Sequence, residues 1–207
     1  MLSSPSGAGK STIGRRLLAE NACMAPSVSA TTRPPRPGEL EGEDYHFLSR
    51  AEFQAKADAG EFLEWAEVHE NCYGTPRAPV ETALKAGRDV LFDIDWQGAR
   101  DVAAAMTGDT VRIFILPPSM AELKRRLYAR AQDAHDVIER RLQRARGEIG
   151  QWGEYDYIVV NHDLDDAYAK VSAIYQAECL RRQRNPWVAQ KVADLIAEPM
   201  ETPTRVR

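Results

Sequence analysis

The sequence predicts an α/β domain in which an open parallel sheet carries helices on both faces. Short apolar segments rich in β-branched residues recur at Val90–Asp95, Val111–Leu116 and Tyr157–Val160, as expected for buried parallel strands. Segments with helical spacing of apolar residues lie between them, and alternation of strand and helix is typical of a sheet covered on both sides. A length of 207 residues suits one such domain with smaller inserted parts.

Composition and charge exclude several classes of function. The chain has 43% hydrophobic and 28% charged residues, the balance of a globular protein. A net charge of −4 gives no general attraction for nucleic acid or anionic membranes, so a polyanion has to be held locally. The sequence has neither an apolar run of about 18 residues nor an apolar secretory signal, so we expect a cytoplasmic protein without a membrane partner. The cysteines and histidines lack metal-ligand or redox spacing, and we expect reduced thiols.

The first chemical motif is a glycine-rich segment over residues 4–12 that leads directly into a helix. Gly7 and Gly9 allow a tight turn that aims backbone N–H groups inward, and the positive end of the following helix adds to their attraction for phosphate. Lys10 contributes a mobile positive charge, and the Ser11 hydroxyl suits Mg²⁺. The segment therefore predicts a phosphate-binding loop and a nucleotide substrate.

This motif departs in two ways from the usual pattern Gly-x-x-x-x-Gly-Lys-Ser/Thr. Ser4 stands where the first glycine is expected. The loop should also follow a buried strand, yet only Met1, Leu2 and Ser3 precede it. We therefore expect the chain to be shortened at its N-terminus, with native residues before Met1 that complete the first strand.

The elements up to residue 79 include an inserted subdomain. Apolar residues at helical spacing predict a helix over 12–21, whereas prolines predict an exposed, stiffened loop over 27–38. Next we expect a strand over 44–48, a helix over 51–59 that Gly60 stops, and a strand over 62–68. Residues 33–79 are therefore expected to form the subdomain.

The core is expected to resume after the subdomain. Strands over 90–95 and 111–116, with a helix over 98–106 between them, form a β-α-β unit. The remaining predicted elements are two arginine-rich helices over 120–131 and 137–147, a strand over 157–160 and a long amphipathic helix over 164–184. Ligands of such sheets bind at the carboxyl ends of the strands.

Two aspartates mark the end of the strand over 90–95. Asp93 ends an apolar run, the place where a nucleotide-transferring core sets a carboxylate for Mg²⁺, directly or through water. Asp95 follows two residues later, so on a strand both carboxylates project from one side and favour a cation or donor between them. The plainer alternative is a strand end that enters a polar loop.

Arginines gather in two places. Arg126 and Arg130 lie four residues apart, a spacing of like charges that disfavours a helix by roughly 0.2–0.5 kcal/mol. Together with Arg141 they suit a lid that closes on a triphosphate and excludes water, although a solvated helix face is the alternative. Arg33 and Arg36 flank two prolines and, in a polyproline-type stretch, project from one side about 9 Å apart. Their convergence on one phosphate would imply a second phosphorylated substrate.

Several segments together resemble the guanylate kinase family. In family order they are Pro5–Thr12, Ser27–Glu39, Asp44–Phe47, Phe62–Trp65, Tyr73–Gly74, Asp93–Gly98 and Tyr157–Asn161. The resemblance covers the chain from its start to about residue 185. It implies a P-loop NTPase core over 1–32, 80–122 and 148–185, a GMP-binding subdomain over 33–79, a helical lid over 123–147, and a weakly ordered tail over 186–207. The implied reaction is ATP + GMP to ADP + GDP, with Mg²⁺ as cofactor and ATP as co-substrate.

The resemblance also implies roles for individual residues. The ATP side would be held by Ser6, Gly7, Ala8, Gly9, Lys10, Ser11, Thr12 and, near adenine, Asn161. The GMP phosphate would be held by Arg33, Arg36, Tyr45 and Tyr73, and guanine by Ser29, Thr75, Glu64 and Asp95. The transferring group would meet Lys10, Arg126, Arg130 and Arg141, and Mg²⁺ would meet Ser11 and Asp93. Adenine would leave the two carboxylates unpaired, because it has an acceptor at N1 and no 2-amino donor.

Two alternative functions remain open on the sequence alone. One is a guanylate-kinase-like interaction module without catalysis, which would be expected to have lost parts of its loop or lid. The other is a related kinase that acts on a sugar phosphate, which would not need the guanine-facing set. Thr75 takes a position that serine often holds, and Ala131-Gln132 replaces a Gly-Thr-like turn, which puts the turnover rate in doubt. The oligomeric state is left open.

Overall fold

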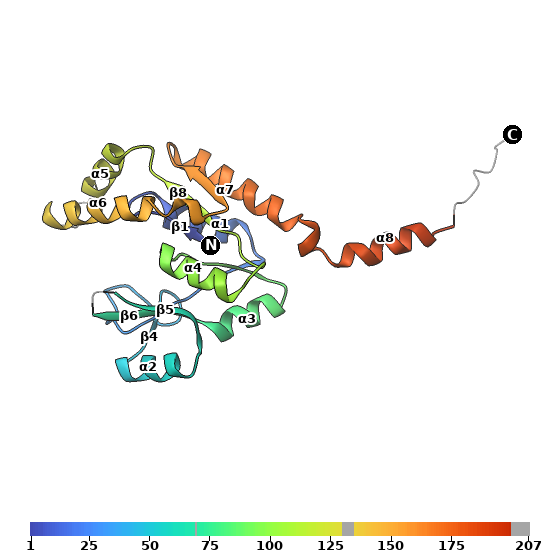
Figure 1. The fold of residues 1–207 in the computed structure, drawn as a ribbon, viewed down its shortest axis with the longest axis horizontal. Coiled ribbons are helices and arrows are strands. Elements are labelled where there is room, and N and C mark those ends of the chain that lie inside the picture. Colours follow the sequence, from blue (N-terminus) through green and yellow to red (C-terminus); the bar gives the residue numbers. More distant parts are fainter. Residues whose placement is uncertain (69, 130–134, 200–207) are drawn as a thin grey trace. The chain divides into compact units, whose positions relative to one another are not determined.

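The computed structural model describes residues 1–68, 70–129 and 135–199 (Figure 1). The chain divides into two compact units, one spanning Met1–Val171 and one that begins at Ser172. All the elements that carry predicted site residues lie in the first unit. The two units are described separately.

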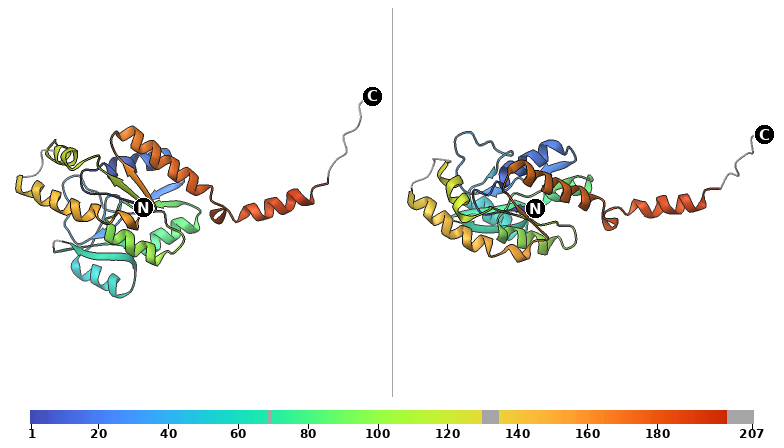
Figure 2. Two further views of the ribbon diagram at one scale, coloured as in Figure 1. Left: turned by 45° about the horizontal axis from the view of Figure 1, so that its top comes forward. Right: turned by 90° about the horizontal axis from the view of Figure 1, so that it is seen from above.

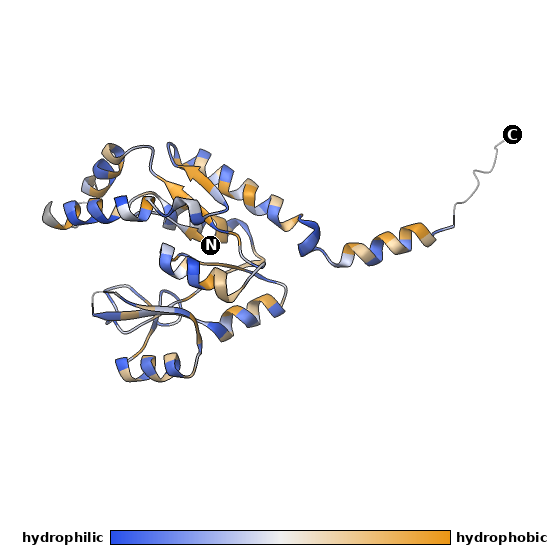
Figure 3. Ribbon diagram, in the orientation of Figure 1, coloured by the Kyte–Doolittle hydropathy of each residue, from blue (hydrophilic) through white to orange (hydrophobic). Residues whose placement is uncertain are grey.

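A parallel sheet forms the core of the first unit. Strands β1 (Leu2–Ser3), β8 (Ile113–Leu116) and β9 (Tyr157–Val160) pair in the order β1-β8-β9, and both pairs are parallel. A second parallel pair, β2 (Met24–Pro26) with β7 (Asp89–Leu91), meets β1 through a bridge between Leu2 and Asp93. Figure 3 shows β8 and β9 as almost continuous hydrophobic segments, as expected for buried parallel strands. The expected parallel sheet is confirmed.

The strand that should precede the phosphate-binding loop is present, and it is two residues long. Leu2 and Ser3 pair in register with Ile113 and Phe114, and residues 1–3 are buried. Helix α1 (Lys10–Glu20) then packs Ile13 and Leu17 into the core. The loop is therefore held between a buried strand and a buried helix face.

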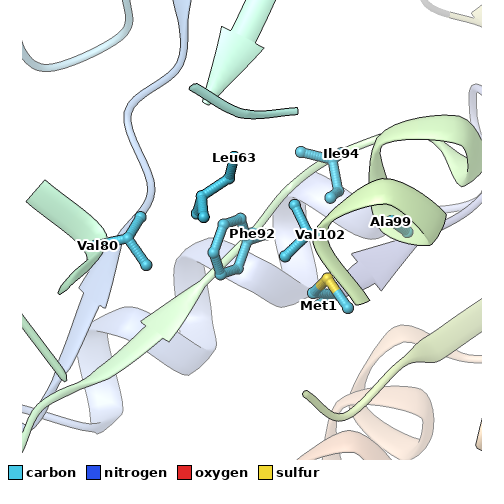
Figure 4. Packing of buried hydrophobic residues seen from close by; sticks show 7 residues of the cluster. All are labelled: Met1, Leu63, Val80, Phe92, Ile94, Ala99 and Val102. Atoms are coloured by element: carbon cyan, nitrogen blue, oxygen red, sulfur yellow. The ribbon is translucent and has the colours of Figure 1, made fainter. Parts of the chain in front are cut away.

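A hydrophobic cluster joins the core to the inserted subdomain. Phe92 and Ile94 follow β7, and Val102 lies on α4 (Trp96–Ala105). Leu63 comes from the subdomain strand β5 (Phe62–Val68), and Figure 4 shows its side chain beside Phe92. This packing ties the segment between β7 and α4 to the subdomain.

The subdomain is a four-stranded mixed sheet with one covering helix. Its strands pair in the order β4-β3-β6-β5, where β3 is Ala30–Thr31, β4 is His46–Phe47 and β6 is Asn71–Pro76. Helix α2 (Arg50–Asp58) begins at a capping box formed by Ser49 and Glu52, and its Phe53 stacks on Phe62 with ring centroids 4.5 Å apart. Helix α3 (Arg77–Lys85) leads back to the core.

The predicted lid helices are α5 (Met120–Ala129) and α6 (His135–Ile149). They pack together through five buried side chains, those of Leu123, Leu127, Ile138, Leu142 and Ala145. The left view of Figure 2 shows these helices and the subdomain at separate places around the core. A 3₁₀ turn (Trp152–Glu154) connects α6 to β9.

The structure differs from the sequence prediction at several elements. β2, β3, β6 and α3 were not expected, and β3 lies inside the segment predicted as an exposed loop. Asp93 and Asp95 do not share a strand, because β7 ends at Leu91 and Asp95 instead caps α4. The carboxylate of Asp95 accepts a hydrogen bond of 2.9 Å from the Gly98 N–H.

The second unit begins within helix α7 (Leu164–Cys179) and continues through a 3₁₀ turn (Arg182–Arg184) to α8 (Trp187–Ala197). Glu178 is buried and forms ion pairs with Arg181 and Arg184 at 3.3 and 3.4 Å. Helix α8 has no buried residue. Among the described residues, no helix combines the length and apolar character needed to cross a bilayer.

Candidate active site

The glycine-rich loop has the geometry of an anion cradle. Gly7 and Gly9 have φ of 92° and 104°, in the left-handed region where a Cβ is strained. Gly9 is the N-cap of α1, and among the described residues no side chain caps this helix. The first N–H groups of α1 are therefore free of a side-chain cap and suit a phosphate.

Lys10 lies between the loop and the segment after β7. Its Nζ is 2.5 Å from Asp93 Oδ1 and donates to the Ile94 carbonyl at 3.2 Å. The Lys10 side chain is 18% exposed and that of Asp93 is 45% exposed. The lysine predicted to contact ATP is thus paired with the carboxylate predicted to serve Mg²⁺.

The residues predicted to hold Mg²⁺ offer oxygen ligands only. Ser11 is exposed at the start of α1, and Asp93 lies beside Lys10. A hydroxyl and one carboxylate suit Mg²⁺, which usually binds few protein ligands together with water and substrate phosphates. The described residues contain no group of three or more His, Cys, Asp or Glu side chains that could hold a metal by themselves. This donor set fits a magnesium ion that binds together with nucleotide.

Asn161 connects the loop to the lid. Its Nδ2 donates to the Ala8 carbonyl at 2.7 Å, and its own carbonyl accepts from Arg126 Nη2 at 3.1 Å. Asn161 is 2% exposed, and a Cβ at Gly9 would lie 2.4 Å from Nδ2. The absence of a side chain at Gly9 is therefore what lets the Asn161 amide reach the loop.

Arg126 is directed into the protein. Besides contacting the Asn161 carbonyl, it donates from Nε to Glu122 at 2.8 Å, and its side chain is 22% exposed. Arg141 is half-buried on α6. Arg130 lies outside the described residues, as does the predicted turn at residues 131 and 132. The structure thus places two of the three predicted lid arginines, one of them in contact with the segment that holds the loop.

Three predicted guanine contacts come together at the start of α4. Thr75 Oγ1 donates to Glu64 Oε1 at 2.6 Å, a pairing that follows directly from the register of β5 and β6. A Cβ at Gly98 would lie 3.3 Å from Glu64 Oε2 and 3.5 Å from Asp95 Oδ1. Both carboxylates therefore approach the same glycine, and their convergence depends on its missing side chain.

The Glu64 carboxyl is harder to ionise than an ordinary glutamate. Burial raises its pKa, the hydrogen bond from Thr75 opposes this, and the negative charge of Asp95 raises it further. A ligand that donates two hydrogen bonds to these carboxylates would relieve both unfavourable effects. The edge of guanine, with its N1–H and 2-amino donors, is such a ligand.

The predicted phosphate site is built around Arg33. Its guanidinium lies 5.2 Å from the centroid of the Tyr45 ring, and the Tyr45 and Tyr73 rings are 6.2 Å apart. Arg33 donates from Nη1 and Nη2 to the two carboxylate oxygens of Glu39, each at 2.9 Å. Arg33, Tyr45 and Tyr73 thus form one cluster, and their binding of a phosphate stays a prediction.

The structure gives fewer contacts for the other residues predicted to bind substrate. Arg36 has an exposed side chain, and the structure records no contact between it and Arg33, so their convergence stays a prediction. Ser29 lies next to β3, and its carbonyl accepts from the His46 N–H at 2.9 Å. Ser6 and Thr12 are exposed on the loop and on α1.

A cavity of about 510 Å³ opens elsewhere on the subdomain. Ala30, Leu48, Phe62 and Arg77 are among its lining residues, and none of the predicted substrate contacts lines it. The cavity is separate from the predicted site.

Comparisons with known proteins identify the family of this chain. The family model for guanylate kinase matches residues 1–178. The chain is 57% identical over 201 residues to a guanylate kinase of Chelativorans sp. (strain BNC1), covering 97% of this chain and 92% of the relative. It is 51% identical to the guanylate kinase of Caulobacter vibrioides, covering 96% and 93% of the two chains. The chain belongs to the guanylate kinase family.

A solved structure supports the same assignment. The crystal structure of guanylate kinase from Anaplasma phagocytophilum matches with a TM-score of 0.72 and 40% identity, over 88% of this chain and 86% of that one. The α/β fold predicted from the sequence is therefore confirmed, as are the guanylate kinase family and a nucleoside monophosphate kinase activity.

Two residues near the candidate site were not predicted from the sequence. Glu39 binds Arg33, and Glu148 on α6 accepts a hydrogen bond from the Ser6 N–H of the loop. Burial raises the pKa of the Glu148 carboxyl, which the nearby Lys10 charge opposes. For Glu39 the turn-forming Pro37-Gly38 pair was a usable signal. Glu148 lies just beyond the helix predicted over 137–147, and no sequence pattern links it to the loop.

Proposed function

We propose that this protein transfers the γ-phosphoryl group of ATP to GMP and forms ADP and GDP. One observation carries the proposal: residues 93–95 serve both predicted sites. Lys10 of the loop contacts Asp93 and the Ile94 carbonyl, and Asp95 lies beside Glu64 at the start of α4. The phosphate cradle and the guanine-facing carboxylates are thus joined through three consecutive residues.

The acceptor would be recognised at both of its ends. Glu64 and Asp95 would accept from the guanine N1–H and 2-amino groups, with hydroxyls of Ser29 and Thr75 nearby. Arg33, Arg36, Tyr45 and Tyr73 would bind the GMP phosphate through charge-assisted hydrogen bonds. AMP would leave the half-buried Glu64 carboxylate with Thr75 and no nucleobase donor, which is how this site would discriminate between purines.

The donor would bind to the loop. The N–H groups of residues 6–12 would hold the ATP phosphates, and Lys10 would exchange its contact with Asp93 for the β- and γ-phosphates. Asn161 would hold the loop in place through its hydrogen bond to the Ala8 carbonyl. The adenine ring of ATP would bind near Asn161. Mg²⁺, held through Ser11 and Asp93, would neutralise charge on the transferring phosphates.

No covalent intermediate is needed for this transfer. Lys10, Arg126, Arg130 and Arg141 would stabilise negative charge on the moving group, and the two sites would hold donor and acceptor in line. Closure of the lid over 123–147 would exclude water, so that phosphate reaches GMP rather than water. In this proposal the acceptor subdomain spans residues 33–79. The enzyme would act in the cytoplasm on soluble nucleotides.

A coupled assay of ADP release tests the proposal with four acceptors: GMP, AMP, UMP and ribose 5-phosphate. We expect turnover with GMP and at least a hundredfold lower kcat/KM with the others, as roughly expected when buried hydrogen-bonding groups lose their partners. Absence of ADP release with every acceptor would favour the interaction module. Turnover with ribose 5-phosphate alone would favour a sugar-phosphate kinase.

A further inference from the structure

Glu39 forms hydrogen bonds with two residues of the predicted GMP phosphate site, Arg33 and Arg36. Neutralising the charge of Arg33 would need only one of these contacts. The two carboxylate oxygens of Glu39 bind Arg33 Nη1 and Nη2 at 2.9 Å each, and one of them also accepts from the Arg36 N–H at 2.7 Å. The Arg33 side chain is 12% exposed and that of Glu39 is 19% exposed. Glu39 thus links the side chain of one predicted phosphate ligand to the backbone of the other.

The local sequence explains how Glu39 reaches both. Residues 36–39 read Arg-Pro-Gly-Glu, with proline and glycine at the central positions of a turn. Gly38 has φ of 90°, and the Glu39 N–H donates to the Arg36 carbonyl at 3.1 Å, so the chain reverses here. The reversal directs the carboxylate back over Arg36 and onto Arg33.

The contacts of Arg33 leave one edge of its guanidinium for a ligand. Nη1 donates to Glu39 and to the Pro34 carbonyl at 2.8 Å, which uses both of its hydrogens, and Nη2 gives one hydrogen to Glu39. The Nε–H and the second Nη2 hydrogen remain for other partners. Tyr73 hydrogen-bonds to this same side chain, and Tyr73 is itself a predicted phosphate contact.

We propose that Glu39 is a positioning residue for the acceptor phosphate. It holds the Arg33 fork and the Arg36 backbone in place, and the phosphate binds at the Nε and Nη2 edge of Arg33, the edge that Tyr73 also contacts, while Glu39 stays bound on the other side. This inference rests on the proposed function, because the phosphate in question is that of GMP. The bond to Arg33 also holds the pKa of Glu39 at about 2, so the carboxylate stays ionised at neutral pH.

A second role for Glu39, as a competitor of the GMP phosphate, predicts the opposite change in GMP affinity. If the carboxylate merely occupied the phosphate position, it would compete with GMP, and removing its negative charge would tighten GMP binding. If Glu39 positions the arginines, its removal weakens GMP binding although the site becomes more positive. The direction of the change therefore separates the two roles.

The test compares Glu39→Ala and the isosteric Glu39→Gln with the wild type. We expect KM for GMP to rise roughly tenfold in Glu39→Ala, about what is lost when a long side chain must be ordered on binding, and by less in Glu39→Gln. We expect kcat and KM for ATP to change by less than twofold. Guanosine, which lacks the phosphate, should inhibit both variants as well as it inhibits wild type.

A matched control is Glu67→Gln, which removes an exposed ion pair of 2.7 Å to Arg50 in the same subdomain. It should leave KM for GMP unchanged. Tighter or unaltered GMP binding in the Glu39 variants would overturn the proposal. A parallel loss of guanosine binding would also overturn it, because it would show a general structural role. If no acceptor is phosphorylated, calorimetric titration measures the affinity of each variant for GMP without any turnover. Failure of the proposed function is therefore distinguished from failure of the proposal for Glu39.

Discussion

At the scale of single residues, the predicted site holds side chains in states that cost stability. Glu64 is the clearest case, since burial and the charge of Asp95 both oppose its ionisation. In the free protein the hydrogen bond from Thr75 offsets only part of this cost, and further donors to the Glu64 carboxylate arrive with a bound ligand. Function and stability should therefore move in opposite directions when Glu64 is replaced.

Glu64→Gln should lower kcat/KM for GMP and raise stability at neutral pH. Loss of charge-assisted hydrogen bonds worth about 1.5–3 kcal/mol each predicts a ten- to hundredfold lower kcat/KM. The raised pKa means that the unfolded carboxyl ionises first, near 4.5, so the destabilisation by Glu64 builds up as pH rises from about 4.5 to its folded pKa and is constant above it. The Tm of the variant minus that of wild type should therefore increase as pH rises from about 4 to 7. A Tm difference that shrinks over this range would contradict the prediction.

Lys10→Met should impair catalysis without unfolding the protein. Loss of one preorganised positive group predicts a kcat about 10²- to 10³-fold lower. Asp93 would lose its partner, but at 45% exposure it remains solvated, so we expect a stability change below about 1 kcal/mol. Steady-state kinetics and thermal unfolding check this, with Lys56→Met, which removes an exposed pair to Glu61, as the control.

The candidate site was predictable from sequence where chemistry follows from adjacent residues. Gly7, Gly9 and Lys10 predict the loop because glycines at these positions permit the positive φ angles of the turn and the lysine follows directly. Glu64 and Asp95 were placed through family resemblance, since their proximity depends on the register of β5 and on the cap of α4. Spacing alone wrongly put Asp93 and Asp95 on one strand.

At the scale of elements, α4 does more than cover the sheet. Its first turn contains Gly98, where an added Cβ would lie within 3.5 Å of both the Glu64 and the Asp95 carboxylates. Glycine is a poor helix former, so its presence here costs the helix roughly 0.5–1 kcal/mol relative to alanine. The space it leaves is what admits both carboxylates.

Gly98→Ala should raise KM for GMP severalfold while leaving KM for ATP unchanged. The new Cβ would lie 3.3 Å from the Glu64 carboxylate and push it away from its position beside Thr75. The matched control is Gly147→Ala on α6, where an added Cβ meets nothing within 4 Å. This control should gain stability and keep its KM for GMP. Equal KM values in both variants would show that Glu64 adapts without loss.

Helices and strands with a clear pattern of apolar residues could be predicted from the sequence. Strands that depend on hydrogen-bonded pairing with a distant strand could not. β9 matched its predicted limits because four apolar residues in a row fit a buried strand. β3 has two residues beside a proline-rich stretch, and its strand geometry comes from pairing with Tyr73 and Gly74 of β6. β6 carries Gly74 and Pro76, which suggest a turn, yet Gly74 is needed where its Cβ would lie 2.8 Å from Trp65 Cβ.

At the scale of the whole molecule, every predicted substrate contact lies in the unit Met1–Val171. The acceptor subdomain is anchored to the core through Leu63 beside Phe92, the residue just before Asp93. The second unit contributes no predicted contact, and α8 leaves Trp187 and Ile196 largely exposed, at 64% and 79%. Catalysis should therefore not depend on this helix.

Removal of residues 187–207 should leave kcat and both KM values within about twofold of wild type, since no interaction assigned to either substrate is lost. Steady-state assays of the shortened protein check this at matched concentrations. Size-exclusion chromatography of both forms shows whether the exposed apolar side chains of α8 affect association. A tenfold fall in kcat would show that the second unit supports the site.

The contact between Lys10 and Asp93 has a consequence for the order of events. While the ammonium group neutralises this carboxylate, a divalent cation finds little net negative charge there and has no incentive to enter by itself. On the proposed mechanism, arrival of a triphosphate would draw the ammonium away and expose the carboxylate at the same moment. The proposed magnesium binding would thereby be coupled to nucleotide occupancy, and the resting protein would not capture whichever divalent ion is most abundant.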